Sequence, residues 1–76
     1  MTQSIEKFKV SESGVIHSIG DSDLELSFMN RGIMKGASFK LVSKVPFKGP
    51  IVLDVEGEIV SIRYSDAINI LTETLV

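Results

Sequence analysis

The 76-residue sequence contains no cysteine and no tryptophan, and it has a single histidine, His17. Without cysteine, disulfides cannot reinforce a core that supplies only about 3–5 kcal/mol at this length. One histidine without cysteine cannot supply the four ligands of a tetrahedral zinc site. It also offers little from which to build a hydrolase site, which needs a nucleophile, a base and a group that orients the base. We therefore expect no metal site and no catalysis. Close barrel packing or weak self-association remains as the source of stability.

Long apolar runs are also missing. No segment approaches the roughly 18 residues of a membrane span. Residues 1–6 do not form the basic segment followed by an apolar one that marks a secretory signal. We therefore expect a cytoplasmic protein with no direct membrane insertion.

Basic and aromatic residues are too few for two classes of binding module. The formal net charge is −2 and the pI is about 5.2, which argues against a nucleic-acid-binding barrel, because such affinity comes largely from Lys and Arg on phosphates. Four Phe and one Tyr are few for the aromatic-lined groove of a polyproline-binding module. We therefore expect neither a nucleic acid nor a proline-rich peptide as the partner.

The clearest pattern surrounds residues 44–50, which contain Pro46, Gly49 and Pro50 between two alternating apolar runs. Each proline fixes φ and removes an amide donor, so one strand must end near Pro46 and the next must begin after Pro50. Glu56 and Gly57 mark a second turn, because glycine permits the positive φ of a tight hairpin. Residues 38–63 are therefore predicted to form a three-stranded meander. The buried face of its first strand is expected to contain Phe39, Leu41, Ser43 and Val45.

Residues 1–9 mix charges with isolated apolar residues and are predicted to form an N-terminal arm, with a single domain over residues 10–76. The β-branched run at residues 13–19 predicts the first strand. Its phase is ambiguous, because Ile16 lies opposite Val15, His17 and Ile19. A bulge near Gly14 would reconcile the two faces.

A helix is predicted to begin with Ser22 as its capping residue and to end at Gly32. Its expected inward stripe consists of Leu26, Met29 and Ile33, with Leu24 and Phe28 flanking it. The acidic residues Asp21, Asp23 and Glu25 suit the positive end of the helix dipole, and we prefer this interpretation to an iron site. His17 is likewise expected to be a surface or packed imidazole rather than a metal ligand.

After the meander, residues 65–68 predict a single helical turn capped by Ser65, followed by a last strand near residues 69–72. Arg63 is expected to be solvated or paired with an acidic neighbour such as Asp54 or Glu56. The predicted fold is mainly β: a small five-stranded SH3-like barrel with one short helix after the first strand and a one-turn helix before the last.

Three segments in this order resemble the FeoA family, the small cytosolic component of bacterial ferrous iron transport. They are GIMKG at residues 32–36, VPFKGP at residues 45–50 and IRYSDA at residues 62–67. The family pattern is a helix ending in a Gly-apolar-x-x-Gly turn, an Ala-Pro-Leu-Gly-x-Pro hairpin and Leu-Arg-x-x-x-Ala before a final strand. The resemblance covers about residues 10–71. Its structural turn residues in this chain are Gly32, Gly36, Pro46, Gly49, Pro50 and Ala67.

The resemblance implies an accessory protein that acts on FeoB, a membrane ferrous iron permease with a cytosolic GTP-binding domain. No cofactor is implied for this chain, and transition metal ion binding is implied only at the level of the family. The alternative is a free-standing SH3-like metal-sensing domain related to the DtxR-type repressors. That alternative needs an upstream DNA-binding and dimerisation domain, which we do not expect within 76 residues.

The chain departs from the family pattern in and beside its loops, where the family usually has apolar residues, proline or glycine. The residues that depart from the pattern are Arg31, Lys35, Phe47 and Lys48, and Met34 is their apolar neighbour. We expect them to give a mixed basic and apolar surface that binds the partner. Phe47 is expected either to plug one end of the barrel or to stand exposed for that partner.

Overall fold

The computed structural model describes residues 2–74. It contains six strands: β1 (Thr2–Ser4), β2 (Ser13–Ile19), β3 (Ser38–Lys44), β4 (Ile51–Val55), β5 (Glu58–Ile62) and β6 (Ile70–Thr74). Three short helical segments join them: the 3₁₀ turn η1 (Ile5–Lys7), helix α1 (Ser22–Met29) and helix α2 (Tyr64–Ala67). The six strands form one sheet in the order β1-β6-β2-β3-β4-β5, and every neighbouring pair is antiparallel.

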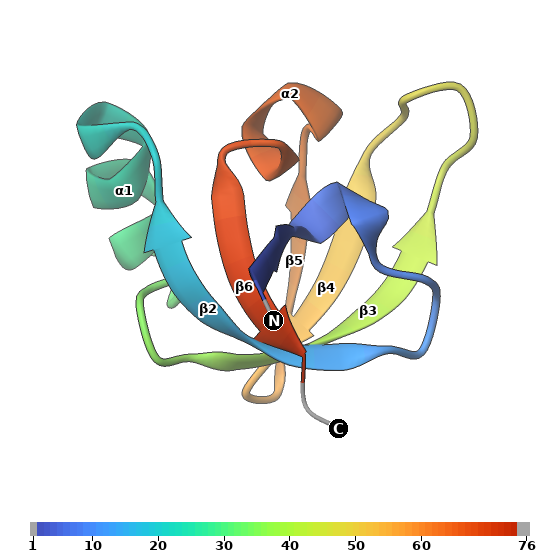
Figure 1. Ribbon diagram of the computed structural model, residues 1–76, viewed down its shortest axis with the longest axis horizontal. Helices are drawn as coiled ribbons and strands as arrows, with labels where there is room; N and C mark the ends of the chain where they lie inside the picture. Colours follow the sequence, from blue (N-terminus) through green and yellow to red (C-terminus); the bar gives the residue numbers. More distant parts are fainter. Residues whose placement is uncertain (1, 75–76) are drawn as a thin grey trace.

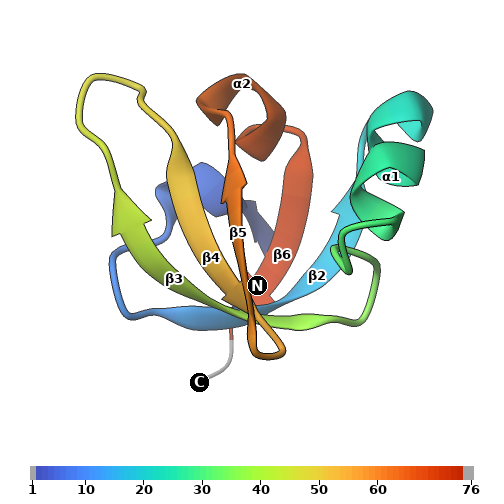
Figure 2. The same ribbon diagram turned by 180° about the vertical axis from the view of Figure 1, so that it is seen from behind.

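The sheet curls strongly around a single core. Figures 1 and 2 show that α1 lies beside β2 on one flank, that α2 lies between β5 and β6, and that the long β3–β4 loop lies on the opposite flank from α1. Among residues 2–74, fifteen hydrophobic residues are buried in this core. Within residues 2–74, no helix is long and apolar enough to cross a membrane.

The meander predicted for residues 38–63 is confirmed. β3 ends at Lys44, just before the prolines, and β4 begins at Ile51, just after them. Between β4 and β5, Glu56 and Gly57 have φ values of 52° and 96°, the left-handed pair that a tight two-residue hairpin requires. A register shift between Leu41 and Ser43 breaks the alternation, however. Ser43 and Val45, which the alternation placed on the buried face, are therefore exposed.

The expected strand count of five was wrong, and the sixth strand comes from the segment for which an arm was predicted. β1 pairs with β6, so that Gln3 lies opposite Thr72, whose hydroxyl donates a 2.9 Å hydrogen bond to the Gln3 carbonyl. The η1 turn then places Ile5 and Phe8 in the core, both with 0% exposure. The Phe8 ring packs against Phe39 with 5.2 Å between centroids. This segment is part of the folded body.

The helix exists as predicted, but its cap and its buried face differ from the prediction. Asp21, not Ser22, is the N-cap residue, and its Oδ1 accepts hydrogen bonds from the amides of Asp23 and Leu24. Leu26 and Met29 are exposed, and the buried helix residue is Phe28. The reason is tertiary: α1 sits on the rim of the sheet, so the core covers only a narrow part of its surface.

The predicted helix stop at Gly32 is confirmed. Gly32 has φ +83°, its amide donates to the Met29 carbonyl, and the Ile33 amide donates to the Phe28 carbonyl. These two bonds form a Schellman motif, in which glycine occupies the left-handed position. Ile33 and Phe28 are both buried, which supplies the hydrophobic contact that usually accompanies the motif. Gly36, with φ +91°, forms the predicted turn into β3.

The bulge in β2 lies at His17 rather than near Gly14. The register with β6 shifts between Ile16 and Ser18, so His17 is the extra residue and Ile16 faces the core. Gly14 has another role. A Cβ at this position would lie 2.7 Å from the Glu73 carbonyl oxygen and 3.0 Å from the Phe8 and Phe39 rings, so only glycine fits between strand and core.

The helical turn before the last strand is confirmed, but Ser65 does not cap it. α2 follows Arg63, and no side chain in the described part of the chain caps its first turn. The Arg63 Nε lies 3.1 Å from Asp66 Oδ2, so its partner is neither of the acidic residues expected. Asp54 instead accepts a hydrogen bond from the Gly57 amide and supports the β4–β5 turn. Ala67, the last residue of α2, is fully buried.

Candidate functional site

The β3–β4 loop places an aromatic side chain in solvent. Phe47 is 99% exposed, so of the two expected alternatives the structure has the exposed one. Phe47 and Lys48 have φ values of 62° and 61°, in the left-handed region that glycine or asparagine occupies at lower cost. A bulky residue is strained there, and the strain is not offset by burial of the phenyl ring.

Hydrogen bonds and close packing constrain the shape of this loop. The Val45 amide donates to the Pro50 carbonyl, and the Gly49 amide donates to the Val45 carbonyl. A Cβ on Gly49 would lie 2.6 Å from the Val45 side chain, so the loop closes only with glycine at this position. The loop is thereby built as a rigid tip that carries Phe47 and Lys48.

Lys44 ties the base of this loop to the N-terminal segment. Its Nζ donates hydrogen bonds to the carbonyl oxygens of Glu6 and Phe8, at 2.6 and 2.9 Å. Between the loop and this segment lies a groove with a volume of about 330 Å³. The groove is lined by Glu6, Lys44, Val45, Pro46, Phe47, Lys48, Gly49, Ile51 and Tyr64.

Glu6 is the unusual polar residue of this groove. Its Oε1 accepts a 2.8 Å hydrogen bond from the Ser4 hydroxyl, whereas its Oε2 is buried with no hydrogen-bond partner among the described residues. The sequence interpretation missed Glu6, Lys44 and Tyr64 as part of this surface. The three-residue spacing of Ile5 and Phe8, which matches one turn of 3₁₀ helix, was the available signal that residues near Glu6 dock on the body.

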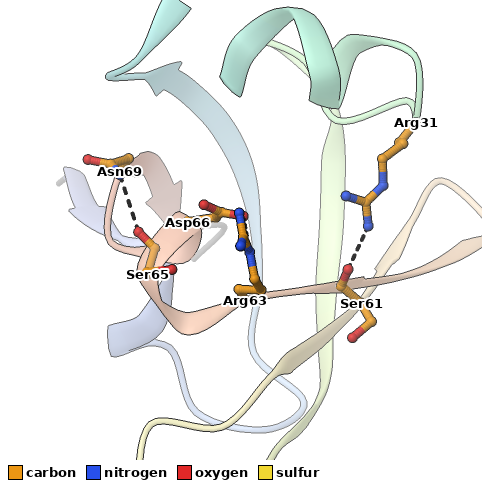
Figure 3. Close-up of polar contacts among 6 residues, drawn as sticks. All are labelled: Arg31, Ser61, Arg63, Ser65, Asp66 and Asn69. Carbon is orange, nitrogen blue, oxygen red and sulfur yellow. Dashed lines mark hydrogen bonds and ion pairs between the residues drawn. The ribbon is translucent and has the colours of Figure 1, made fainter. Parts of the chain in front are cut away.

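The other three residues of the expected partner surface lie in the α1–β3 loop. Met34 is 42% exposed and Lys35 is exposed, beside a groove of about 480 Å³. Arg31 reaches across to β5, where its Nη2 donates a hydrogen bond to the Ser61 carbonyl (Figure 3). Its guanidinium also lies 5.4 Å from the centroid of the Phe28 ring.

The five expected residues therefore form two surfaces instead of one. Figures 1 and 2 both place the β3–β4 loop and the α1–β3 loop on opposite flanks of the molecule. We call the first the hairpin-tip surface, consisting of Phe47, Lys48 and the groove beneath them. The second, the α1-loop surface, consists of Arg31, Met34 and Lys35.

The residues considered as metal ligands have local structural contacts. Asp21 caps α1, and His17 Nδ1 lies 3.8 Å from Glu73 Oε1 on the outside of the sheet. In the part of the chain that the structure describes, no three His, Cys, Asp or Glu side chains come together in a group that could hold a metal ion. Asp23 and Glu25 lie in the first turn of α1.

A small antiparallel sheet curled around one core, with a helical turn before its last strand, defines a domain of the SH3-like class. A family model for the FeoA domain matches residues 4–74. The chain belongs to this family, which is linked to ferrous iron transport. A search of curated protein sequences found no match.

Solved structures similar to this chain include FeoA proteins and repressors. An iron uptake regulatory protein (FeoA) superposes with a TM-score of 0.88 at 20% identity, covering 99% of each chain. The zinc complex of FeoA from Stenotrophomonas maltophilia, described as a prokaryotic SH3 domain protein, has a TM-score of 0.80 at 20% identity, covering 93% of this chain and 89% of the other. A manganese-dependent transcriptional repressor in complex with manganese has a TM-score of 0.89 at 18% identity. That match covers 97% of this chain and 37% of the repressor, and it shows a shared fold alone.

Proposed function

We propose that this protein is a cytosolic accessory component of bacterial ferrous iron uptake that acts by binding the GTP-binding domain of a FeoB-type transporter. Membership of the FeoA family supports this role. The similar protein from Stenotrophomonas maltophilia is described as a candidate bacterial ferrous iron transport activating factor, which agrees with it. In this role the protein regulates by contact and catalyses nothing itself.

Phe47 is the observation that carries the proposal. Its side chain contributes no burial to the core, and its backbone adopts a conformation that disfavours a bulky residue. Folding alone would favour glycine or asparagine at this position. A large aromatic side chain on a rigid tip is the type of anchor that dominates the binding energy of protein interfaces. We therefore assign the contact with FeoB to the hairpin-tip surface.

The neighbouring residues suit such a contact. Lys48 beside Phe47 adds a positive charge at the rim, where charges chiefly steer association and select partners. The groove below the tip is partly apolar, with Val45, Pro46 and Ile51 in its lining. A partner side chain could enter the groove while Phe47 packs on the partner.

Calorimetric titration of the full chain into the soluble GTP-binding domain of the cognate FeoB, with and without guanine nucleotide, tests the proposal. Phe47→Asn removes the aromatic ring and also relieves the left-handed strain, so the variant should fold at least as stably as wild type. We expect it to bind at least about tenfold more weakly, as for loss of an interface anchor. Leu26→Gln is the matched control, because Leu26 is 63% exposed on α1, on the other flank.

Three outcomes contradict the assignment in different ways. Equal affinity of wild type and Phe47→Asn rejects the hairpin-tip surface. If Lys35→Glu weakens binding while Phe47→Asn does not, the α1-loop surface makes the contact. Saturable uptake of ferrous iron by this protein, with no heat against FeoB, would identify a carrier or sensor instead of a contact regulator.

A further inference from the structure

Strand β5 has an open hydrogen-bonding edge. It stands at the end of the sheet, and among the described strands it pairs with β4 alone. Val55 of β4 and Glu58 of β5 flank the two-residue turn, so they form a hydrogen-bonded pair. Hydrogen-bonded pairs alternate along the strands, and the next one contains Val60. The intervening residues, Ile59 and Ser61, must therefore direct their amides and carbonyls away from β4.

One of these outward groups is covered by a side chain. Arg31, thirty positions earlier in the sequence, donates to the Ser61 carbonyl, and Figure 3 shows its side chain extending from the α1–β3 loop to that strand. Within residues 2–74, no hydrogen bond is found for the other outward groups, namely the Ser61 amide and the amide and carbonyl of Ile59. The Ile59 side chain beside them is 65% exposed. Uncovered edges with apolar side chains are templates for pairing with another strand.

We propose that β5 pairs antiparallel with β5 of a second copy of this chain, and that Arg31 is a removable cover that restrains this pairing. The charges at the two ends of β5 favour a second copy over an unrelated strand. Glu56 and Glu58 lie at the turn end, and Arg63 follows the other end. A two-fold axis midway between the two antiparallel β5 strands places the acidic end of each copy against the basic end of the other.

The interface between the two copies is both polar and apolar. Pairing supplies partners to the amides and carbonyls of Ile59 and Ser61, and it buries the exposed Ile59 side chain of each copy against the other. The Arg63 side chain is 80% exposed and uses Nε for Asp66, which leaves its terminal nitrogens for the acidic end of the other copy. The cost is loss of the Arg31 hydrogen bond in each copy.

Sedimentation velocity of the full chain over a concentration series tests the proposal with two arginine variants. Arg31→Ala removes the cover, and the dimer dissociation constant should fall at least tenfold. Arg63→Ala removes the complementary charge, and the same constant should rise severalfold. Both variants lose one positive charge, so an effect of net charge alone would shift the dimer dissociation constant in the same direction in both. Shifts of equal sign, or an Arg31→Ala variant no more associated than wild type, overturn the proposal.

Two further variants separate edge pairing from non-specific aggregation. Ile59→Pro in the Arg31→Ala background deletes an amide that faces the open edge and makes no bond to β4, a position where edge strands tolerate proline. This double variant should be monomeric. Ile59→Lys, which leaves the backbone intact, should also be monomeric in that background. If either folded double variant still dimerises, or if the amides of Ile59 and Ser61 exchange as fast in the dimer as in the monomer, β5 is not the interface.

Discussion

Lys44 is expected to join the hairpin-tip surface to the N-terminal segment, and replacing it by methionine tests this connection. Methionine keeps much of the length and the apolar stem of lysine but removes the ammonium. The carbonyls of Glu6 and Phe8 then lose their donor, at 2.6 and 2.9 Å. Ile5 and Phe8, which are fully buried, would remain in the core with one fewer tether.

The magnitude follows from the surroundings of the two hydrogen bonds. A hydrogen bond to a charged group contributes about 1.5–3 kcal/mol when buried. One of these bonds is exposed and the other is partly buried, and water can replace the lost donor at both carbonyls. We therefore expect Lys44→Met to lower the free energy of unfolding by about 1–2 kcal/mol. For a domain of this size each kcal/mol corresponds to about 4–8 °C in Tm.

Urea denaturation and thermal unfolding measure this loss, and amide exchange locates it. Exchange should accelerate most at Phe8, whose amide donates to the Ile5 carbonyl. Lys40→Met is the control, because Lys40 lies on the same strand and is exposed, and its ammonium makes no hydrogen bond or ion pair with residues 2–74. The control should stay within about 0.5 kcal/mol of wild type. Equal stability of the two variants would refute the tether.

Four further substitutions test the packing and the helix cap. Asp21→Ala should cost about 0.5–2 kcal/mol because α1 loses its N-cap, whereas Ser22→Ala should cost less than about 0.5 kcal/mol; the reverse order in thermal unfolding would restore Ser22 as the cap. Gly14→Ala should destabilise by about 1–3 kcal/mol in urea, since its Cβ would lie 2.7 Å from the Glu73 carbonyl oxygen, and an unchanged midpoint would contradict that contact. Ile5→Val should cost about 0.5–1.5 kcal/mol, as for a core residue; no loss on denaturation would return this segment to the status of an arm.

Local chemistry predicted the centre of the molecule correctly. Proline cannot donate to the hydrogen-bond ladder of an interior strand, so the limits of β3 and β4 around Pro46 and Pro50 could be read from the sequence. Gly32 and Gly57 occupy left-handed positions that few other residues adopt without strain, which identified the end of α1 and the β4–β5 turn. These features depend on a residue and its immediate neighbours, and they also carried the resemblance to the FeoA family.

Long-range partners decided what the sequence pattern left open. β1 has three residues and no period of its own, and it is a strand only because β6, about seventy residues later, offers it an edge. Whether Phe28 or Leu26 faces the core depends on where the curved sheet lies relative to α1. Adjacent Asp21 and Ser22 are both good capping residues, and in the folded chain the extended backbone lies at Asp21, which is the cap.

The candidate surfaces also depend partly on local sequence and partly on tertiary structure. Composition and family departures singled out five residues, but they contain no information on distances between loops. Folding placed the β3–β4 loop, which contains Phe47 and Lys48, on the opposite flank from the α1–β3 loop. It also turned Arg31 toward the edge of β5. The turns at Gly32 and Gly57, the limits of β3 and β4 around the prolines, and the family could be predicted from local sequence. The curvature of the sheet decided which side chains share a surface, because it brings together or separates segments that no local pattern connects.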